Sequence, residues 1–210
     1  MMTRTFAIAS AAALVVALGA FYLMTSGGSG DDAFAQCRAG QVAGGTDQIG
    51  GPFTLVDETG RTVTSEEVLD EPALIYFGYT FCPDVCPLDT ARNAEAVDIL
   101  EERGIMVKPV FISIDPARDT PEVLADFTDN LHPRMIGLTG TPEQVKVAST
   151  AYRTYYKANE AEAGQEDFYL VDHSTFTYLT LPGHGFVEFF RRDVPAEEMA
   201  DRVACFIDAG

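Results

Sequence analysis

The sequence ALIYFGYTFCPDVCPLDTARNAEAVDILEERGIMVKPVFISID occupies residues 73–115. Its first seven residues form an uninterrupted apolar run of strand length, which suits a central strand covered on both faces. A helix is expected from Pro87 to Arg103, with Gly104 as its stop, and a second strand from Val107 to Asp115. The face of this helix expected to be buried carries Leu88, Ala91, Val97 and Leu100. Strand, helix and strand in this order predict a right-handed crossover between two parallel strands, and hence an α/β core.

Further elements are expected on both sides of this unit. A β-hairpin starts at Gly50 and turns at Asp57–Gly60, and a short helix follows at the capping-box pair Thr64 and Glu67. The remaining expected elements are a helix from Thr120 to about Leu131, a strand at 135–138, a helix from Thr141 toward Lys157, strands at 168–171, 176–181 and 186–190, and a final helix opened by Pro195. This order is similar to a thioredoxin-like fold with an N-terminal β-hairpin extension and insertions.

The N-terminal apolar run Phe6–Met24 contains no charged residue and approaches the thickness of a bilayer's hydrocarbon layer. Arg4 precedes it, and Asp31 and Asp32 follow it, which favours an N-terminus in the cytoplasm and a domain outside. The alternative is a cleaved signal peptide, because residues 33–35 read Ala-Phe-Ala. The apolar run is long for a signal peptide and ends well before this site, so we expect an N-terminal transmembrane helix.

The 210 residues suffice for one core in addition to the anchor. We expect an anchor or uncleaved signal at 1–25, a flexible glycine-rich tether at 26–48 and the domain at 49–210. The formal net charge of -18 and the pI near 4.3 argue against nucleic acid as a partner. Such acidity keeps a domain soluble and also suits a basic partner.

The segment TFCPDVCPLD, residues 80–89, places two thiols four residues apart where the strand ends and the helix begins. This spacing is close to one helical turn, so both sulfurs can face the same side. Pro87 suits a first helical turn, so Cys86 is expected to cap the helix, whose dipole would favour a thiolate there. Two such thiols can form a disulfide, exchange disulfides or hold a soft metal ion, and their spacing does not choose among these.

His173 follows the strand-like run FYLVD, and the carboxyl ends of strands are where sites collect in α/β proteins. It is therefore a candidate to meet Cys82 and Cys86. Taken alone, a histidine beside a strand is more often an ordinary hydrogen-bonded residue than a ligand.

Three motifs give the chain a resemblance to a known family. They are C-P-x-x-C-P at Cys82–Pro87, S-I-D-P-x-R-D-T-P at Ser113–Pro121 and V-D-H-S at Val171–Ser174. Through them the chain resembles the Sco (SenC) family of copper chaperones over about residues 50–208.

The resemblance implies a domain that binds Cu(I) or Cu(II) through Cys82, Cys86 and His173. It implies delivery of copper to the dinuclear copper A centre of cytochrome c oxidase during assembly. The chemistry agrees, because thiolates select Cu(I) and imidazole suits both oxidation states, whereas structural zinc usually requires a fourth protein ligand. The domain would lie in the periplasm, anchored to the inner membrane of a bacterium, with an upstream copper donor or thiol reductant as a further partner.

Two other functions use the same residues. The protein is either a metallochaperone without enzymatic activity or a thiol-disulfide oxidoreductase that reduces the acceptor's copper-site cysteines with Cys82 and Cys86. A peroxidase would use Cys82 as nucleophile, with Arg118 stabilising its thiolate. Neither enzyme requires His173.

Polar residues near these motifs suggest supporting roles. The family match suggests that Asp115, expected at the end of its strand, is a carboxylate that tunes copper binding without being a main ligand. Arg118 and Asp119 are expected to form a local ion pair. Asp172 orients His173 or caps a turn. We interpret the two other histidines of the chain as non-ligands, His132 and His184.

The other two cysteines, Cys37 and Cys205, are far apart in the sequence. Cys205 projects away from the expected buried stripe of the last helix, which carries Met199, Val203, Phe206 and Ile207. An exposed thiol in an oxidising compartment is a liability, so a structural Cys37–Cys205 disulfide is one expectation. The alternative is that Cys37 stays unpaired.

Overall fold

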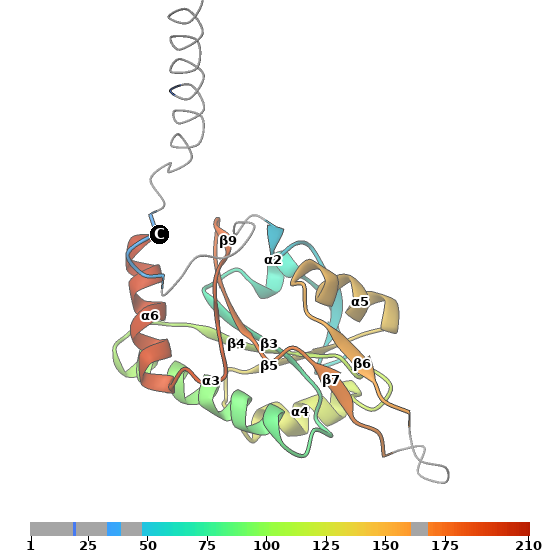
Figure 1. Ribbon diagram of the computed structural model, residues 1–210. Helices are drawn as coiled ribbons and strands as arrows, with labels where there is room; N and C mark the ends of the chain where they lie inside the picture. Colours follow the sequence, from blue (N-terminus) through green and yellow to red (C-terminus); the bar gives the residue numbers. More distant parts are fainter. Residues whose placement is uncertain (1–18, 20–32, 39–47, 161–167) are drawn as a thin grey trace, which may run out of the picture. The chain divides into compact units, whose positions relative to one another are not determined.

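The computed structural model describes residue 19 and residues 33–38, 48–160 and 168–210 (Figure 1). The chain divides into two compact units, residues 1–36 and 37–210. Within the described residues, no helix is long and apolar enough to cross a membrane. The expected anchor at 1–25 lies outside the described residues except for Gly19, as does most of the tether.

Most of the described strands of the second unit form one mixed sheet. Its order is β2-β1-β5-β4-β3-β8-β9. The bounds are β1 Thr54–Asp57, β2 Thr62–Thr64, β3 Ala73–Gly78, β4 Lys108–Ser113, β5 Ile136–Thr139, β8 Thr177–Leu181 and β9 Gly185–Phe190. The central strands β3, β4 and β5 run parallel, and β8 and β1 add to them antiparallel. This confirms the parallel pair, the N-terminal hairpin and the C-terminal hairpin expected from the sequence.

The helices cover the sheet on both faces. Their bounds are α2 Ser65–Val68, α3 Val85–Glu102, α4 Pro121–Asp129, α5 Pro142–Ala151 and α6 Ala196–Ala209. Helix α3 connects β3 to β4, and α4 connects β4 to β5, so both connections step in the same direction across the sheet. Right-handed connections therefore place α3 and α4 on the same face. Figure 1 shows these two helices on one side of the sheet and α5 on the other.

Local signals in the sequence set several of these boundaries. Thr64 makes the expected capping box with Glu67, and Thr141, the expected helix start, makes a second one with Gln144. Gly60 takes a φ of 84° in the β1–β2 turn, a left-handed conformation that glycine adopts without strain. Helix α5 ends at Ala151, earlier than the expected extension toward Lys157, because the chain turns into a strand.

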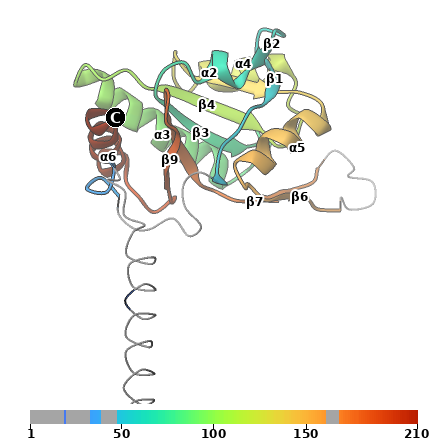
Figure 2. The same ribbon diagram turned by 90° about the horizontal axis from the view of Figure 1, so that it is seen from above.

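That strand is β6, Tyr156–Ala158, which the sequence did not indicate. It pairs antiparallel with β7, Val171–His173, in a separate two-stranded sheet. Figures 1 and 2 both show this pair beside α5. The strand expected at 168–171 therefore lies later, and His173 is the last residue of β7 instead of following a strand.

The core is centred on β3 and β4, whose residues are all buried. Large side chains from both strands fill it, including Phe77, Phe111 and Ile112. This confirms that the run expected at 73–79 is a strand covered on both faces, which ends one residue earlier, at Gly78. The expected strand Val107–Asp115 is shorter at both ends, so Asp115 lies just beyond β4.

Candidate metal centre

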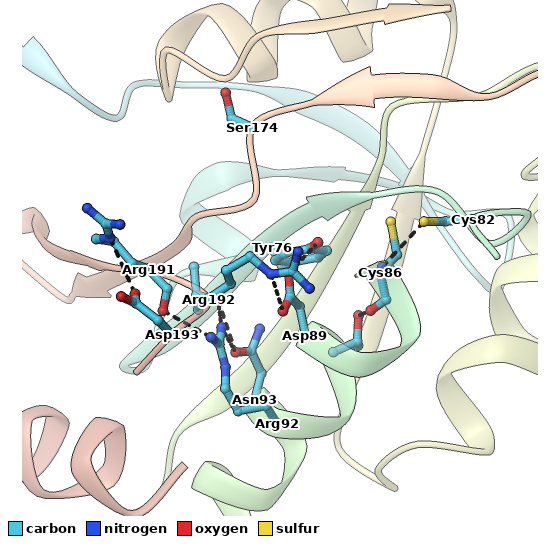
Figure 3. Close-up of polar contacts among 12 residues, drawn as sticks. Tyr76, Cys82, Cys86, Asp89, Arg92, Asn93, Ser174, Arg191, Arg192 and Asp193 are labelled. Atoms are coloured by element: carbon cyan, nitrogen blue, oxygen red, sulfur yellow. Dashed lines mark hydrogen bonds and ion pairs between the residues drawn. The ribbon is translucent and has the colours of Figure 1, made fainter. Parts of the chain in front are cut away.

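The two cysteines of the C-x-x-x-C motif lie at the junction between β3 and α3. Helix α3 begins at Val85 with Asp84 as its N-cap residue, so Cys86 lies in the first turn and is not the cap that we expected. Cys82 lies in the preceding loop. The backbone N–H of Cys86 donates a hydrogen bond to Cys82 Sγ over 3.4 Å. The helix start, and not a cap at Cys86, therefore fixes the position of the Cys82 sulfur (Figure 3).

The imidazole of His173 reaches the same place from the β6–β7 sheet. Its Nδ1 lies 2.8 Å from the carbonyl oxygen of Ser174, and its Nε2 lies 3.3 Å from Cys86 Sγ. Because only a protonated Nδ1 can donate to that carbonyl, the neutral ring presents the Nε2 lone pair to the sulfurs. Two tyrosine rings lie nearly perpendicular to the imidazole, with centroids at 6.3 Å for Tyr76 and 5.9 Å for Tyr79.

Cys82, Cys86 and His173 thus offer two sulfurs and one nitrogen, all within 4.8 Å of one another. Within residues 33–38, 48–160 and 168–210, no other set of three or more His, Cys, Asp or Glu side chains converges in this way. Both thiols are free. The chain therefore brings together a pair and a single residue that lie 87 positions apart.

The two thiols have opposite acid–base properties. Burial disfavours the Cys82 thiolate, but hydrogen bonds from the backbone N–H groups of Cys86, Asp84 and Val85 outweigh it and lower the pKa of Cys82. Burial raises the pKa of Cys86 well above that of an ordinary thiol, and the nearby Cys82 contributes to the rise. The expectation of a thiolate at Cys86 is therefore wrong, because the helix N-terminus points its N–H groups at Cys82.

Burial also lowers the pKa of His173, against a rise caused by its hydrogen bond to Ser174. The imidazole is thus held in the neutral form, which is the form that binds metal ions. Burial raises the pKa of Tyr79 to about 12, so this ring stays a neutral neighbour at physiological pH.

A pocket of about 320 Å³ opens beside the three side chains. Its lining includes Cys82 and His173 but not Cys86, whose side chain is fully buried. Pro83 and Leu170 form part of its walls, and the exposed carboxylates of Asp84 and Asp172 also line it. An incoming molecule therefore meets Cys82 and His173 before it meets Cys86.

Comparisons with known proteins place this arrangement in a family. The sequence model described as SCO1/SenC matches residues 41–208. Protein SenC of Rhodobacter capsulatus is 53% identical over 207 residues, which cover 99% of this chain and 92% of that protein. The chain belongs to the SCO1/SenC family.

Other members of this family are similar in sequence and structure. The mitochondrial SCO1 homolog 1 of Arabidopsis thaliana is 42% identical over 156 residues, which cover 74% of this chain and 46% of that relative. A crystal structure of Arabidopsis thaliana ScoI with copper bound has a TM-score of 0.71 and 40% identity, covering 76% of this chain and 99% of that chain. The fold is accordingly the thioredoxin-like α/β fold of the Sco structures.

A buried polar network lies one turn further along α3 from Cys86 in this SCO1/SenC chain (Figure 3). Asp89 accepts a hydrogen bond from the Tyr76 hydroxyl over 3.1 Å, and Arg192 Nε lies 3.8 Å from its other oxygen. Asn93 accepts hydrogen bonds from Arg92 and Thr177. Burial raises the pKa of Asp89. We did not predict this network from the sequence.

The expected face of α3 was also wrong at its start. Leu88 is 62% exposed and Ala91 is exposed, whereas Val97 and Leu100 are buried as expected. The buried stripe continues from Leu100 and Val97 back through Asn93 and Asp89 to Cys86. That stripe has helical spacing, so the signal was present but carried polar residues.

The segment after β4 contacts the loop that carries Cys82. Asp115 and Arg118 form a buried ion pair, so the expected pair between Arg118 and Asp119 is wrong. Asp119 is fully buried and instead accepts hydrogen bonds from the backbone N–H and hydroxyl of Thr80 and from the hydroxyl of Ser113. Asp119 thereby anchors the start of the loop that carries Cys82.

The remaining residues singled out from the sequence lie outside the ligand set. Asp172 is exposed on β7 opposite Lys157, and the Ser174 carbonyl, not Asp172, orients His173. His132 Nδ1 accepts from the backbone of Arg134, so its protonated Nε2 faces Asp98 at 3.3 Å. His184 lies in the exposed β8–β9 turn.

Cys37 and Cys205 form a disulfide with a Cα–Cα distance of 5.7 Å. It joins residue 37 to α6, whose Met199, Val203 and Phe206 are buried as expected, while Ile207 is only half-buried. The alternative of an unpaired Cys37 is not what the structure shows.

Proposed function

We propose that this SCO1/SenC chain carries one copper ion as cargo on Cys82, Cys86 and His173. The observation that supports this most strongly is the convergence of three soft or borderline ligand atoms within 4.8 Å, with the Nε2 lone pair directed at the sulfurs. Two thiolates suit Cu(I), and the imidazole allows the ion to be held as Cu(II) as well. Copper binding in the Arabidopsis relative agrees with this assignment.

The recipient that we propose is the dinuclear copper A centre of cytochrome c oxidase. Thiolates and imidazoles of such a site can replace the chaperone's ligands one at a time. Exchange would begin at Cys82 or His173, because these line the pocket whereas Cys86 is buried behind them. Copper leaves when the acceptor's ligands have displaced all three.

We also propose that the domain works on the periplasmic side of a bacterial inner membrane, tethered by the apolar run 6–24. Two observations support this location. The run is long enough to span a bilayer and is followed by acidic residues. The Cys37–Cys205 disulfide suits an oxidising compartment. An upstream copper donor or thiol reductant would then act in the same compartment.

Copper titration of the full chain, purified in detergent and fully reduced under anaerobic conditions, tests the cargo assignment. We expect one Cu(I) or Cu(II) per chain. His173→Ala should lose most of its Cu(II) affinity, because Cu(II) depends on the nitrogen ligand, whereas His184→Ala, which changes an exposed turn, should bind copper as the parent does. Tight Cu(II) binding by His173→Ala would falsify the ligand assignment. Copper transfer to an apo copper A domain tests the proposed recipient.

A second function is favoured by the unequal thiols. A low-pKa Cys82 at the pocket and a buried Cys86 behind it resemble an attacking and a resolving thiol. The Cys82 thiolate would attack an acceptor disulfide and form a mixed disulfide. Cys86 would then attack the Cys82 sulfur, form the Cys82–Cys86 disulfide and release the acceptor with both thiols reduced, so that two electrons pass to the acceptor. An external thiol reductant must then restore the pair. His173→Ala should keep this activity while it loses Cu(II) binding, which separates the two functions.

A further inference from the structure

An aromatic cage surrounds the guanidinium of Arg118 beside the metal centre. The Arg118 Cζ atom lies 3.6 Å from the ring centroid of Tyr169, 4.9 Å from that of Phe81 and 5.7 Å from that of Tyr79. The side chain is 12% exposed. A guanidinium stacked on rings in a partly desolvated position is held firmly, because its planar charge is attracted to each ring face.

The rings of this cage come from the two segments that carry the metal ligands. Phe81 immediately precedes Cys82 in the β3–α3 loop. Tyr169 lies four residues before His173, on the segment that leads into β7. Arg118 itself belongs to neither segment, because it lies in the turn after β4. Its guanidinium therefore joins the cysteine loop to the histidine segment.

Hydrogen bonds to Asp115 connect Arg118 with Tyr169, one of the rings of the cage. One carboxylate oxygen of Asp115 accepts from Arg118 Nε, and the other accepts from the Tyr169 hydroxyl over 2.6 Å. Two residues later, the backbone N–H of Val171 donates to the Tyr79 hydroxyl over 3.2 Å. The segment that enters β7 is thus fixed at Tyr169 and again at Val171.

We propose that Arg118 is a positioning residue of the metal centre. By holding Tyr169 against Phe81, it sets the distance between His173 Nε2 and the two sulfurs, so that an ion takes the nitrogen together with both thiolates. The inference rests on the proposed copper function for the identity of the ion. The cysteine loop is anchored independently through Asp119, so loss of the Arg118 contacts acts chiefly on the histidine.

This proposal predicts different effects on the binding of Cu(I) and of Cu(II). Cu(I) is a soft ion that the two thiolates can hold without the imidazole, whereas Cu(II) depends more on the nitrogen ligand. Weakening the position of His173 should therefore reduce Cu(II) binding and leave most Cu(I) binding. General damage to the fold would reduce both.

The test uses the full chain in detergent and four variants. Arg118→Gln removes the cation, and Arg118→Lys keeps a charge without the planar stack. Tyr169→Phe removes only the hydroxyl bond to Asp115. The matched control is Arg103→Gln, whose guanidinium makes a surface ion pair with Asp201.

We expect Arg118→Gln to lower Cu(II) affinity about 10- to 100-fold, as loss of a partner around metal ligands commonly does. The nitrogen hyperfine coupling in the Cu(II) electron paramagnetic resonance spectrum should weaken, while Cu(I) affinity measured against a chelator stays close to that of the parent. Arg118→Lys and Tyr169→Phe should fall between the parent and Arg118→Gln. Unchanged Cu(II) affinity and coupling, or equal loss of both oxidation states, would overturn the proposal.

A measurement without metal distinguishes failure of this inference from failure of the proposed function. Amide hydrogen exchange should be at least about tenfold faster at Val171 and its neighbours in Arg118→Gln than in the parent or in Arg103→Gln, because their hydrogen bonds open more often. If the parent binds no copper, the proposed function fails, and the exchange result alone decides whether Arg118 holds the segment. Unchanged exchange would count against Arg118 in either case.

Discussion

Cys82 and Cys86 lie four residues apart, yet their surroundings push their acidities in opposite directions. Burial acts against ionisation of both, but only Cys82 receives the N–H groups of the helix N-terminus. The sequence indicated that both thiols belong to one site. It did not indicate which sulfur faces the helix end, because that depends on where α3 begins, and Pro87 suggested a later start than Val85.

Alkylation of the reduced, metal-free chain by iodoacetamide should therefore modify Cys82 first. The lowered pKa of Cys82 leaves more thiolate at pH 7 than an ordinary thiol has, and the rise of its rate with pH should be centred below the usual thiol value of about 8.5. The raised pKa of Cys86 keeps that thiol protonated throughout. Peptide mass mapping after short exposures measures both rates. Faster labelling of Cys86 would contradict this assignment, and Cys82→Ser shows the rate of Cys86 alone.

A second residue-scale prediction concerns Asp119, whose buried carboxylate accepts from Thr80 and Ser113. In Asp119→Asn the amide NH₂ faces one of these donors, so a buried group is left unsatisfied at a cost of about 1–3 kcal/mol. Denaturant unfolding of the metal-free chain measures this loss. Asp126→Asn, which alters an exposed carboxylate on α4, serves as the control. Equal stability of the two variants would show that the Thr80 anchor contributes little.

At the scale of elements, α3 shows which features of a helix the sequence predicts and which it does not. Its existence, its crossover topology and the burial of Val97 and Leu100 were predictable from apolar spacing and glycine stops. Its first two turns were not, because hydrophobicity pointed to Leu88 while the buried stripe continues through Asp89. A rule based on apolar residues misplaces a helix face wherever a functional site buries polar groups.

The β6–β7 pair gives the same lesson for the histidine. The run before His173 indicated a strand, but its partner β6 is short and mostly exposed, so no apolar alternation marks it. The convergence of His173 with the cysteines also depends on a contact between segments far apart in sequence, the hydrogen bond from Val171 to Tyr79 over 92 positions. Only the family resemblance, and not the local pattern, could place the imidazole in advance.

The packing of β3 against α3 yields an element-scale prediction at Gly78. A Cβ atom there would lie 2.8 Å from Tyr76 Cε1, 3.0 Å from Phe111 Cε2 and 3.2 Å from Cys86 Sγ. Gly78→Ala should therefore destabilise the domain by about 1–3 kcal/mol through overpacking and weaken copper binding by displacing Cys86. The control is Gly51→Ala, where the closest atom is at 3.4 Å. Thermal unfolding and copper titration of both variants measure the effects. Parent-like behaviour of Gly78→Ala would mean that the strand–helix interface yields easily.

At the scale of the whole molecule, the Cys37–Cys205 disulfide closes a loop over a sequence separation of 168 residues without touching the ligand set. A cross-link of this span restricts the unfolded chain, so the double variant Cys37→Ser/Cys205→Ser should lose about 2–5 kcal/mol of unfolding free energy. Copper affinity should stay at the parent value, because Cys82, Cys86 and His173 are positioned by β3, α3 and β7. Denaturant unfolding and copper titration of the double variant, beside Ala209→Ser on the same helix, measure the two quantities separately. Loss of copper affinity together with stability would mean that the disulfide between Cys37 and α6 also affects the metal centre. The structural role of Cys37 and Cys205 could then not be treated as independent of the metal-binding role of Cys82 and Cys86.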